Sequence, residues 1–259
     1  MQYFCGIDIG AYAAKLVIIA ERGQVVAKAM RRSGVDYAQA AEHVLADALE
    51  AASLERSQLL RSLATGYGRD NVPWTDGKKT EIACHGKGAY FTFRKAMTVV
   101  DIGAQDSKVI HLDEAGHRTG FKMNRKCAAG TGAFLEEIAH RLAVDLSDLN
   151  ALAERSTMDA PLSSFCTVFA ATEVLGRIRA GEKVHDIVRA AFCSVVKRII
   201  EMDRVDGMLV TTGGVVAHNP FLAQLLGKAL GTEALTPPDA QYTGAFGAAL
   251  FAIEENEKG

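Results

Sequence analysis

The sequence predicts an α/β protein of two related lobes with a cleft between them. Predicted strands are followed by predicted helices twice along the 259-residue chain. The segments "GIDIGAYAAKLVII" (6–19) and "VDIGAQDSKVIHL" (100–112) also repeat each other, since each places a lysine seven residues after the aspartate of Asp-Ile-Gly. A repeat at matching spacing indicates two related halves. We predict that residues 1–115 form one lobe and 116–259 the other, and the final helix is a candidate to return to the first.

The strands are predicted from short runs rich in β-branched and other apolar residues. In both repeats the glycine lies between two such runs, which predicts a hairpin of a strand, a tight turn and a second strand. Strands are expected over residues 3–10, 14–20, 24–30, 60–65, 97–102, 107–112, 118–123 and 207–211.

The helices are predicted from apolar residues that recur with the 3.6-residue period of a helix. In the helix expected over 131–142, for example, Phe134, Leu135, Ile138 and Leu142 form one apolar face. Helices are expected over residues 36–53, 80–92, 131–142, 167–180, 184–203, 220–230 and 241–254.

Composition and charge argue against several classes of function. Hydrophobic residues make up 49% of the chain and charged residues 23%, as in ordinary globular proteins. A formal net charge of −2 gives no electrostatic reason to expect nucleic acid or an acidic membrane surface as a partner. The N-terminus "MQYFCGIDIG" lacks the features of a secretory signal, and no apolar run approaches the ~18 residues of a membrane span. We expect a soluble, cytoplasmic protein.

The cysteines argue against a disulfide framework, because they are five in number and widely spaced. We therefore expect reduced thiols that are either buried or bound to a metal. Cys5, Cys84 and Cys193 lie in apolar stretches, so we expect these three in the core.

The two repeated turns have the residues that hold a triphosphate. A glycine after a strand, such as Gly10 or Gly103, lets backbone N–H groups approach phosphate oxygens closely. Asp8 and Asp101 are expected where a magnesium ion bridges the phosphates, and we expect both to be catalytic.

The second strand of each hairpin adds a positive charge through Lys15 and Lys108. At the second turn, Gln105 and Asp106 are polar and are candidates to orient a water for attack on the γ-phosphate. Gln105 is our third candidate for a catalytic residue.

Further glycines follow a strand or precede a helix. The segment "LVTTGGVVAHNP" (209–220) offers a turn that can lie flat against a purine or ribose, and "DAQYTGAFGAAL" (239–250) adds small residues beside it. Gly130-Thr131-Gly132 opens a helix, where an anion is favoured. Each glycine alone fits an ordinary turn, but together, in this order, they favour a nucleotide cleft.

The ordered set Asp8-Ile-Gly10, Asp101-Ile-Gly103 and Thr212-Gly-Gly-Val resembles the actin, sugar-kinase and Hsp70 superfamily of ATPases. The resemblance implies two ribonuclease-H-like lobes that close on ATP and Mg²⁺. The positions expected at ATP and Mg²⁺ are Gly10, Ala11, Tyr12, Ala13, Ala14, Lys15, Gly103, Ala104, Asp106, Lys108, Gly130, Thr131, Gly132, Gly213, Gly214, Val215, Gln241 and Gly244.

Two cysteines lie directly before predicted helices. Cys127 is in "RKCAAGTG" (125–132) and Cys166 is in "SSFCTVFA" (163–170), and the start of a helix stabilises a thiolate. Two thiolates are too few for a structural zinc or an ordinary iron–sulfur cluster. The two cysteines are therefore either buried core residues, or half of a four-thiolate set that a two-fold dimer completes around a four-iron four-sulfur cluster.

The segments "MNRKCAAGTGAFLE", "CTVFA", "ATGYGRD" (64–70) and "EIACHGKGAYF" (81–91) closely resemble the activators of 2-hydroxyacyl-CoA dehydratases. The same family includes the ATPase subunits of benzoyl-CoA reductase, and the resemblance runs from Gly6 to about Ala252. It implies that Cys127 and Cys166 hold one 4Fe-4S cluster between the subunits of a homodimer, or between this chain and a related one.

The resemblance also implies a reaction. ATP binding and hydrolysis drive the transfer of one electron from the cluster to a partner acyl-CoA dehydratase or reductase, and ferredoxin or flavodoxin supplies electrons upstream. Movement of the helices after Cys127 and Cys166 is expected to couple the two events.

The chain departs from the family pattern at three places. The first turn reads Gly10-Ala11-Tyr12 in place of Gly-Ser-Thr, which removes two hydroxyl donors, although backbone donors remain. Ala104 replaces a glycine, which would restrict the turn if that position needs a positive φ. Arg125 replaces an acidic residue and makes the surroundings of Cys127 more positive.

Three other functions fit parts of the pattern. The chain could be the ATPase subunit of a benzoyl-CoA reductase-type complex or, with less support, a small-molecule kinase of the same superfamily. It could also be a regulatory ATPase in which nucleotide acts only as a conformational switch and the cysteines are structural.

Overall fold

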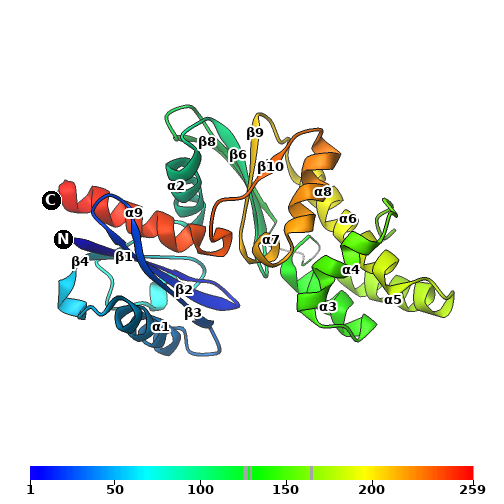
Figure 1. The fold of residues 1–259 in the computed structure, drawn as a ribbon, viewed down its shortest axis with the longest axis horizontal. Coiled ribbons are helices and arrows are strands. Elements are labelled where there is room, and N and C mark those ends of the chain that lie inside the picture. The colour runs from blue at the N-terminus through cyan, green and yellow to red at the C-terminus, as the bar shows by residue number, and fades with distance from the viewer. Residues whose placement is uncertain (125–127, 129, 164–165, 259) are drawn as a thin grey trace. The chain divides into compact units, whose positions relative to one another are not determined.

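The computed structural model describes residues 1–124, 128, 130–163 and 166–258 (Figure 1). The chain divides into two compact units. Unit 1 comprises Met1–Lys95, Asp113–Arg118 and Tyr242–Gly259, and unit 2 comprises Ala96–Leu112 and Thr119–Gln241. Within the described residues, no helix is both long and apolar enough to span a membrane.

Unit 1 contains a five-stranded sheet in the order β3-β2-β1-β4-β5. The first three strands form an antiparallel meander, and β4 and β5 continue the sheet in parallel with β1. The strands are β1 (Tyr3–Ile9), β2 (Ala13–Ala20), β3 (Val25–Arg32), β4 (Leu59–Thr65) and β5 (Gly77–Lys78).

Helices cover both faces of this sheet, which explains why β2 is apolar at nearly every position. On one face, α1 (Tyr37–Ala52) packs against Leu16 and Ile18 of β2. On the other face, α9 (Thr243–Glu257) packs against Val17 and Ile19, and α2 (Glu81–Phe93) packs on α9. Short 3₁₀ helices span Arg56–Gln58 and Arg69–Asn71.

Unit 2 repeats the same sheet, in the order β8-β7-β6-β9-β10. Again an antiparallel hairpin is followed by two strands parallel to its first strand. The internal repeat of the sequence is therefore also a repeat of topology. The strands are β6 (Met97–Ile102), β7 (Ser107–Leu112), β8 (Arg118–Asn124), β9 (Met208–Thr212) and β10 (Ala234–Leu235).

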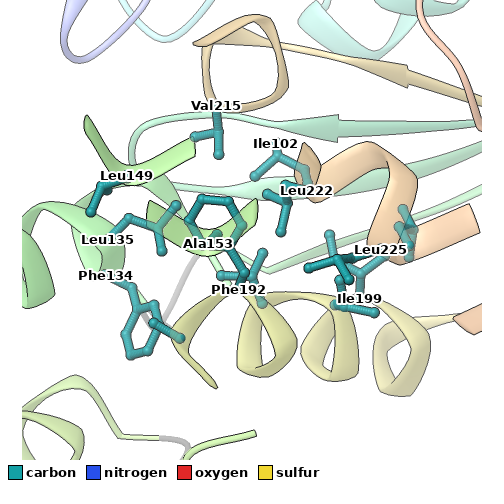
Figure 2. Packing of buried hydrophobic residues seen from close by; sticks show 14 of the residues in the cluster. Ile102, Phe134, Leu135, Leu149, Ala153, Phe192, Ile199, Val215, Leu222 and Leu225 are labelled. Carbon is teal, nitrogen blue, oxygen red and sulfur yellow. The ribbon is translucent and has the colours of Figure 1, made fainter. Parts of the chain in front are cut away.

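One large core joins the helices of unit 2 to the sheet (Figure 2). Phe192 and Ile199 lie on α6 (Val184–Met202), whose apolar side packs against the other helices. The remaining helices are α3 (Gly132–Leu142), α4 (Leu149–Arg155), α5 (Thr167–Arg179), α7 (Gly214–His218) and α8 (Pro220–Leu230), with 3₁₀ helices over Leu146–Asp148 and Ala240–Tyr242.

All of the predicted strands and helices are found, and the differences are short elements and unit ranges. The helices α4 and α7 have seven and five residues, too few for a periodic pattern to be recognised. Unit 2 also takes in β6 and β7, which lie inside the predicted range 1–115, because β6 pairs with β9. The last helix, α9, lies in unit 1.

The crossing of α2 and α9 leads to a stability prediction for Gly247. A Cβ at this position would lie 1.9 Å from the Cys84 carbonyl oxygen. Gly247→Ala should therefore lower the free energy of unfolding by the ~1–3 kcal/mol typical of overpacking, and with it the thermal unfolding midpoint. The control is Gly176→Ala in α5, where nothing lies within 4 Å and the helix should gain up to ~1 kcal/mol. Equal midpoints for the two variants would contradict the close crossing.

Candidate functional site

The hairpin of β1 and β2 holds a buried carboxylate beside a lysine. Asp8 and Lys15 are directly opposite each other across the two strands, and Lys15 Nζ lies 3.3 Å from Asp8 Oδ2. Only 1% of Asp8 is exposed. The Gly10 amide donates to the Ala13 carbonyl over 3.1 Å and closes the turn. The tight turn thus follows the carboxylate by two residues.

The hairpin of β6 and β7 has the same arrangement in unit 2. Asp101 and Lys108 are opposite each other, with Lys108 Nζ 3.1 Å from Asp101 Oδ2. Lys108 is fully buried and also donates to Asp106 Oδ1 over 2.7 Å. The Gly103 amide donates to the Asp106 carbonyl over 2.9 Å. Because a buried charge needs a partner, each aspartate–lysine pair fixes both of its members.

A second glycine supports each aspartate from the neighbouring parallel strand. Gly66 follows β4 with a φ of +87°, and Gly213 follows β9 with a φ of +98°. A Cβ on Gly66 would lie 2.3 Å from Asp8 Oδ1, and one on Gly213 would lie 2.7 Å from Asp101 Oδ1. The glycine motifs of the sequence predicted Gly213 but not Gly66. The sequence did contain a signal for Gly66, because "ATGYGRD" places a glycine directly after a strand, as "VTTGG" does.

The two aspartates differ in their hydrogen bonds. Asp101 Oδ1 accepts a hydrogen bond from the Thr212 hydroxyl over 3.1 Å, in addition to the lysine contact on Oδ2. Asp8 Oδ1 is buried and has no hydrogen-bond partner among the described residues. A buried carboxylate oxygen without a donor fits a cation or its water shell, because either would satisfy the oxygen.

The turn of the second hairpin is bonded to the start of α3. Gly132 N donates to the Gly103 carbonyl over 2.9 Å, and Ala133 N donates to the Ala104 carbonyl over 2.8 Å. Ser107 Oγ donates to the Gly130 carbonyl over 2.6 Å. The structure therefore brings Gly130-Thr131-Gly132 to the hairpin, and these two amides of the helix start bind protein carbonyls.

The alanine that replaces a family glycine is compatible with this turn. Ala104 is not among the residues with a positive φ, the region in which an alanine would be strained. Its carbonyl is engaged by α3 as a glycine carbonyl would be. The departure at Ala104 therefore leaves the turn intact.

Tyr12, a second departure from the family pattern, is held against the end of β3. Arg32 Nη2 donates to the Tyr12 hydroxyl over 2.8 Å, and the guanidinium lies 4.8 Å from the ring centroid. The Ser33 amide donates to the Tyr12 carbonyl over 3.0 Å, and the Ser33 hydroxyl donates to the Gly10 carbonyl over 2.6 Å. Two backbone carbonyls of the turn are thus hydrogen-bonded to Ser33, the residue that follows β3.

Several other predicted positions lie beside these turns. Ala13, Ala14 and Val215 have buried side chains, so only their backbone atoms are available to a ligand. A Cβ on Gly244 would lie 3.0 Å from Asp8 Oδ2, so this glycine leaves room for the carboxylate. A Cβ on Gly214 would meet nothing within 4 Å, so this position borders open space.

The remaining predicted positions differ in exposure. Ala11 in the first turn and Gln105 in the second are exposed, whereas Gln241 is half-buried. Thr131 is buried, and its hydroxyl donates to the Ala128 carbonyl over 2.5 Å. The Gly213 amide donates over 3.1 Å to the carbonyl of the residue before Gln241. This hydrogen bond places the residue before Gln241 beside Gly213, the glycine that lies next to Asp101.

The cysteines divide into two groups. Burial raises the pKa of Cys5 and of Cys84 to about 12, so both stay thiols at neutral pH, and the prediction that they lie in the core is confirmed. Cys193 is half-buried, and burial raises its pKa as well. Cys166 is exposed and caps the start of α5, where its carbonyl accepts a hydrogen bond from the Ala170 amide over 2.8 Å. Cys127 lies outside the described residues, as does Arg125.

An exposed apolar stripe follows Cys166 along α5. Val168 is 72% exposed and Phe169 is 67% exposed, and Leu175 and Ile178 continue the stripe about two and three turns further on. At about 3.6 residues per turn, Val168 and Leu175 lie on the same side of α5, whereas Phe169 and Ile178 lie on opposite flanks, so the stripe spreads over about half of the helix circumference. Exposed apolar side chains of this kind are typical of a surface that another protein covers.

The chain is similar to proteins of a known family. Residues 5–252 match the family model described as the BadF/BadG/BcrA/BcrD ATPase family. The (R)-2-hydroxyglutaryl-CoA dehydratase activating ATPase of Acidaminococcus fermentans is 41% identical over 260 residues, which cover 99% of this chain and 99% of that protein. The resemblance that the sequence motifs predicted is thereby confirmed.

Solved structures agree with the fold. The activator of the 2-hydroxyisocaproyl-CoA dehydratase from Clostridium difficile, with bound ADPNP, superposes with a TM-score of 0.93 at 36% identity and covers 99% of this chain and 96% of that one. A ROK family glucokinase from Streptomyces griseus has a TM-score of 0.57 at 12% identity, covers 98% of this chain and 100% of that one, and is similar in fold alone. The predicted fold class is confirmed.

The close approach of Gly66 to Asp8 leads to a prediction. Gly66→Ala should weaken ATP binding about tenfold or more, ~1.4 kcal/mol, because its Cβ would displace the carboxylate. The control is Gly34→Ala, since Gly34 also has a positive φ of +58° but nothing within 4 Å. Titration with a fluorescent ATP analogue measures both affinities. Equal affinities would show that Gly66 does not position Asp8.

Proposed function

The chain belongs to the BadF/BadG/BcrA/BcrD ATPase family, and from this premise we propose that it is an ATP-dependent electron donor that activates a 2-hydroxyacyl-CoA dehydratase or a related radical acyl-CoA reductase. One observation carries the proposal. The Gly103–Ala104 turn is hydrogen-bonded to the start of α3, and that start follows Cys127 by only a few residues in the sequence. A change at the Gly103–Ala104 turn would therefore act on α3, the helix that follows Cys127 in the sequence.

In this proposal, ATP binds through the backbone amides of the turns at Gly10 and Gly103. Lys15 and Lys108 hold the two aspartates in place. Mg²⁺ and its waters lie near Asp8, whose Oδ1 has no hydrogen-bond partner among the described residues and so supports a cation. Gln105 and Asp106 lie in the second turn and orient the attacking water.

The same proposal assigns Cys127 and Cys166 as the protein ligands of one 4Fe-4S cluster. Each chain offers two thiolates, so two chains supply the four that such a cluster takes. The exposed start of α5 supports this role for Cys166, because a ligand of a shared cluster must face a second chain. When bound, the cluster supplies one electron to the partner enzyme and regains one from ferredoxin or flavodoxin.

The apolar stripe of α5 supports a dimer that is built around this helix. A two-fold axis beside α5 would cover Val168 and Phe169 and bring the two Cys166 residues towards each other. A related chain with the same stripe would serve equally, as in a benzoyl-CoA reductase-type complex.

The first test is anaerobic purification with iron analysis and electron paramagnetic resonance after reduction. We expect about four irons per dimer, a signal of a reduced cluster, and a change in this signal on addition of ATP. Cys166→Ser should lose the iron and the activation of a dehydratase but retain ATP binding. Cys193→Ser is the control, because Cys193 is half-buried within the core helix α6.

Other outcomes of this test favour other functions. An iron-free anaerobic preparation contradicts the electron donor. ATP consumption that depends on an added small-molecule substrate would indicate a kinase. If Cys166→Ser still activated the partner, the nucleotide would act as a conformational switch, and the cysteine would be structural.

The second test concerns the dimer. Phe169→Glu places a charge on the α5 stripe and should convert the dimer to a monomer that retains ATP binding but not iron. Val35→Glu is the control, since Val35 is a fully exposed apolar residue of unit 1. Light scattering after gel filtration measures the mass of each variant. A Phe169→Glu protein that remains a dimer would rule out this interface.

A further inference from the structure

We propose that Arg189 and Ser194 of α6 are positioning residues that hold the segment between α4 and α5 and thereby fix Cys166 at the start of α5. The inference rests on the proposed function, because the position of Cys166 matters to the reaction only if this thiol is a ligand. It goes further by naming two residues, remote from the nucleotide turns in the sequence, on which that position depends.

Arg189 is a buried arginine whose donors are used by this segment. Its side chain is 9% exposed, and Nε donates to the Met158 carbonyl over 2.7 Å. Nη1 donates to the Ser156 carbonyl over 2.6 Å and to the Ala153 carbonyl over 3.4 Å. Nη2 donates to the Asp159 carboxylate. One guanidinium therefore ties down the end of α4 and the first residues after it.

Asp159 closes this contact from the solvent side. Its second oxygen accepts a hydrogen bond from Lys228 of α8 over 2.7 Å. The hydrogen bonds from Arg189 and Lys228 lower the pKa of Asp159 to about 2. The carboxylate is therefore ionised at neutral pH and bridges α6 and α8 through the segment.

Ser194 holds the next part of the segment. Its hydroxyl donates to the Ala190 carbonyl over 3.0 Å and accepts a hydrogen bond from the Leu162 amide over 2.8 Å. The Leu162 side chain is buried in the core of unit 2. One residue later, the Ser163 amide donates to Glu173 of α5 over 2.8 Å. The chain is thus fixed up to a point three residues before Cys166 in the sequence.

The composition of α6 supports a specific role for the two side chains. Ten residues of this helix are buried, and eight of them are apolar, Ala, Val, Ile or Phe. Only Arg189 and Ser194 are polar among these ten. A buried polar side chain is unfavourable unless its hydrogen bonds are made, and here the segment makes them. The main role of these two residues is therefore to position the segment between α4 and α5, and not to fill the core.

The same helix reaches the turn that is bonded to the nucleotide hairpin. A Cβ on Gly130 would lie 2.9 Å from Arg198 Cγ, so the Gly130 turn packs directly on α6. The Gly130 carbonyl in turn accepts the hydrogen bond from Ser107 of β7. Within unit 2, α6 is thus packed against the Gly130 turn at one part of its length and holds the segment between α4 and α5 at another.

The test compares Ser194→Ala and Asp159→Asn with the wild type. Ser194→Ala removes the hydroxyl that accepts the hydrogen bond of the Leu162 amide. Asp159→Asn weakens the ion pair of Asp159 with Arg189, and because Asp159 is exposed, this change leaves the core unchanged. Arg141→Gln on α3 is the control, because it removes an exposed ion pair of the same unit away from the segment. Arg189→Gln is the stronger variant where it folds.

We expect three results. Hydrogen exchange over residues 156–163 should become several-fold faster in Ser194→Ala and Asp159→Asn, and the affinity for a fluorescent ATP analogue should change less than about twofold. The electron paramagnetic resonance spectrum of the reduced, anaerobically prepared protein should shift or lose intensity, with less iron retained per chain. The control should match the wild type in all three measurements.

Two outcomes overturn the inference in different ways. If the wild type holds iron and the variants exchange faster over 156–163 but keep an unchanged spectrum and iron content, the segment does not position Cys166. The proposed function survives that result. If the wild type itself holds no iron, the proposed function fails, and this inference fails with it.

Discussion

The buried aspartate–lysine pair of each hairpin is the interaction on which the arrangement of both units depends. Asp8 with Lys15, and Asp101 with Lys108, place opposite charges across two antiparallel strands, and both carboxylates are buried. An unpaired charge at such a site would be strongly destabilising, so the pairing fixes the register of each hairpin and the direction of its carboxylate. The glycine turns and the close approaches of Gly66 and Gly213 then follow from the place of these carboxylates.

The two units have similar backbone topology, but their aspartates differ in hydrogen bonding. Thr65 and Thr212 lie at matching ends of β4 and β9, each beside the aspartate of its unit. Thr212 donates to Asp101 Oδ1, whereas Asp8 Oδ1 accepts no hydrogen bond from any described residue. Asp101 is therefore held on both oxygens and Asp8 on one. The two copies of the motif therefore differ in one respect. The carboxylate in unit 2 is bonded on both oxygens, whereas the one in unit 1 has an oxygen that can bind a ligand.

The sequence was sufficient for the parts that rest on periodic or repeated patterns. Every long helix and strand was predicted, as was the hairpin around Asp101, because local residues decide these features. Gly66 was missed because its role depends on the parallel pairing of β1 with β4, and the glycine after a strand in "ATGYGRD" does not by itself show which carboxylate it approaches. Arg189 could be seen only as a charge in an apolar helix, because its carbonyl partners belong to an irregular segment.

The contacts within unit 2 explain how a small change at the hairpin can reach a thiol without a long path. Gly103 and Ala104 are bonded to the start of α3, the Gly130 turn packs on Arg198, and Ser194 of the same α6 holds Leu162. Each of these contacts is a hydrogen bond or a close steric contact, and both kinds are lost when the two groups move apart by more than a small distance. In the proposed function, a displaced turn that kept these contacts would move α6, and through Ser194 it would move Leu162. Coupling requires an element whose position two sites both bias, and the contacts of α6 support the proposal that it is this element in unit 2.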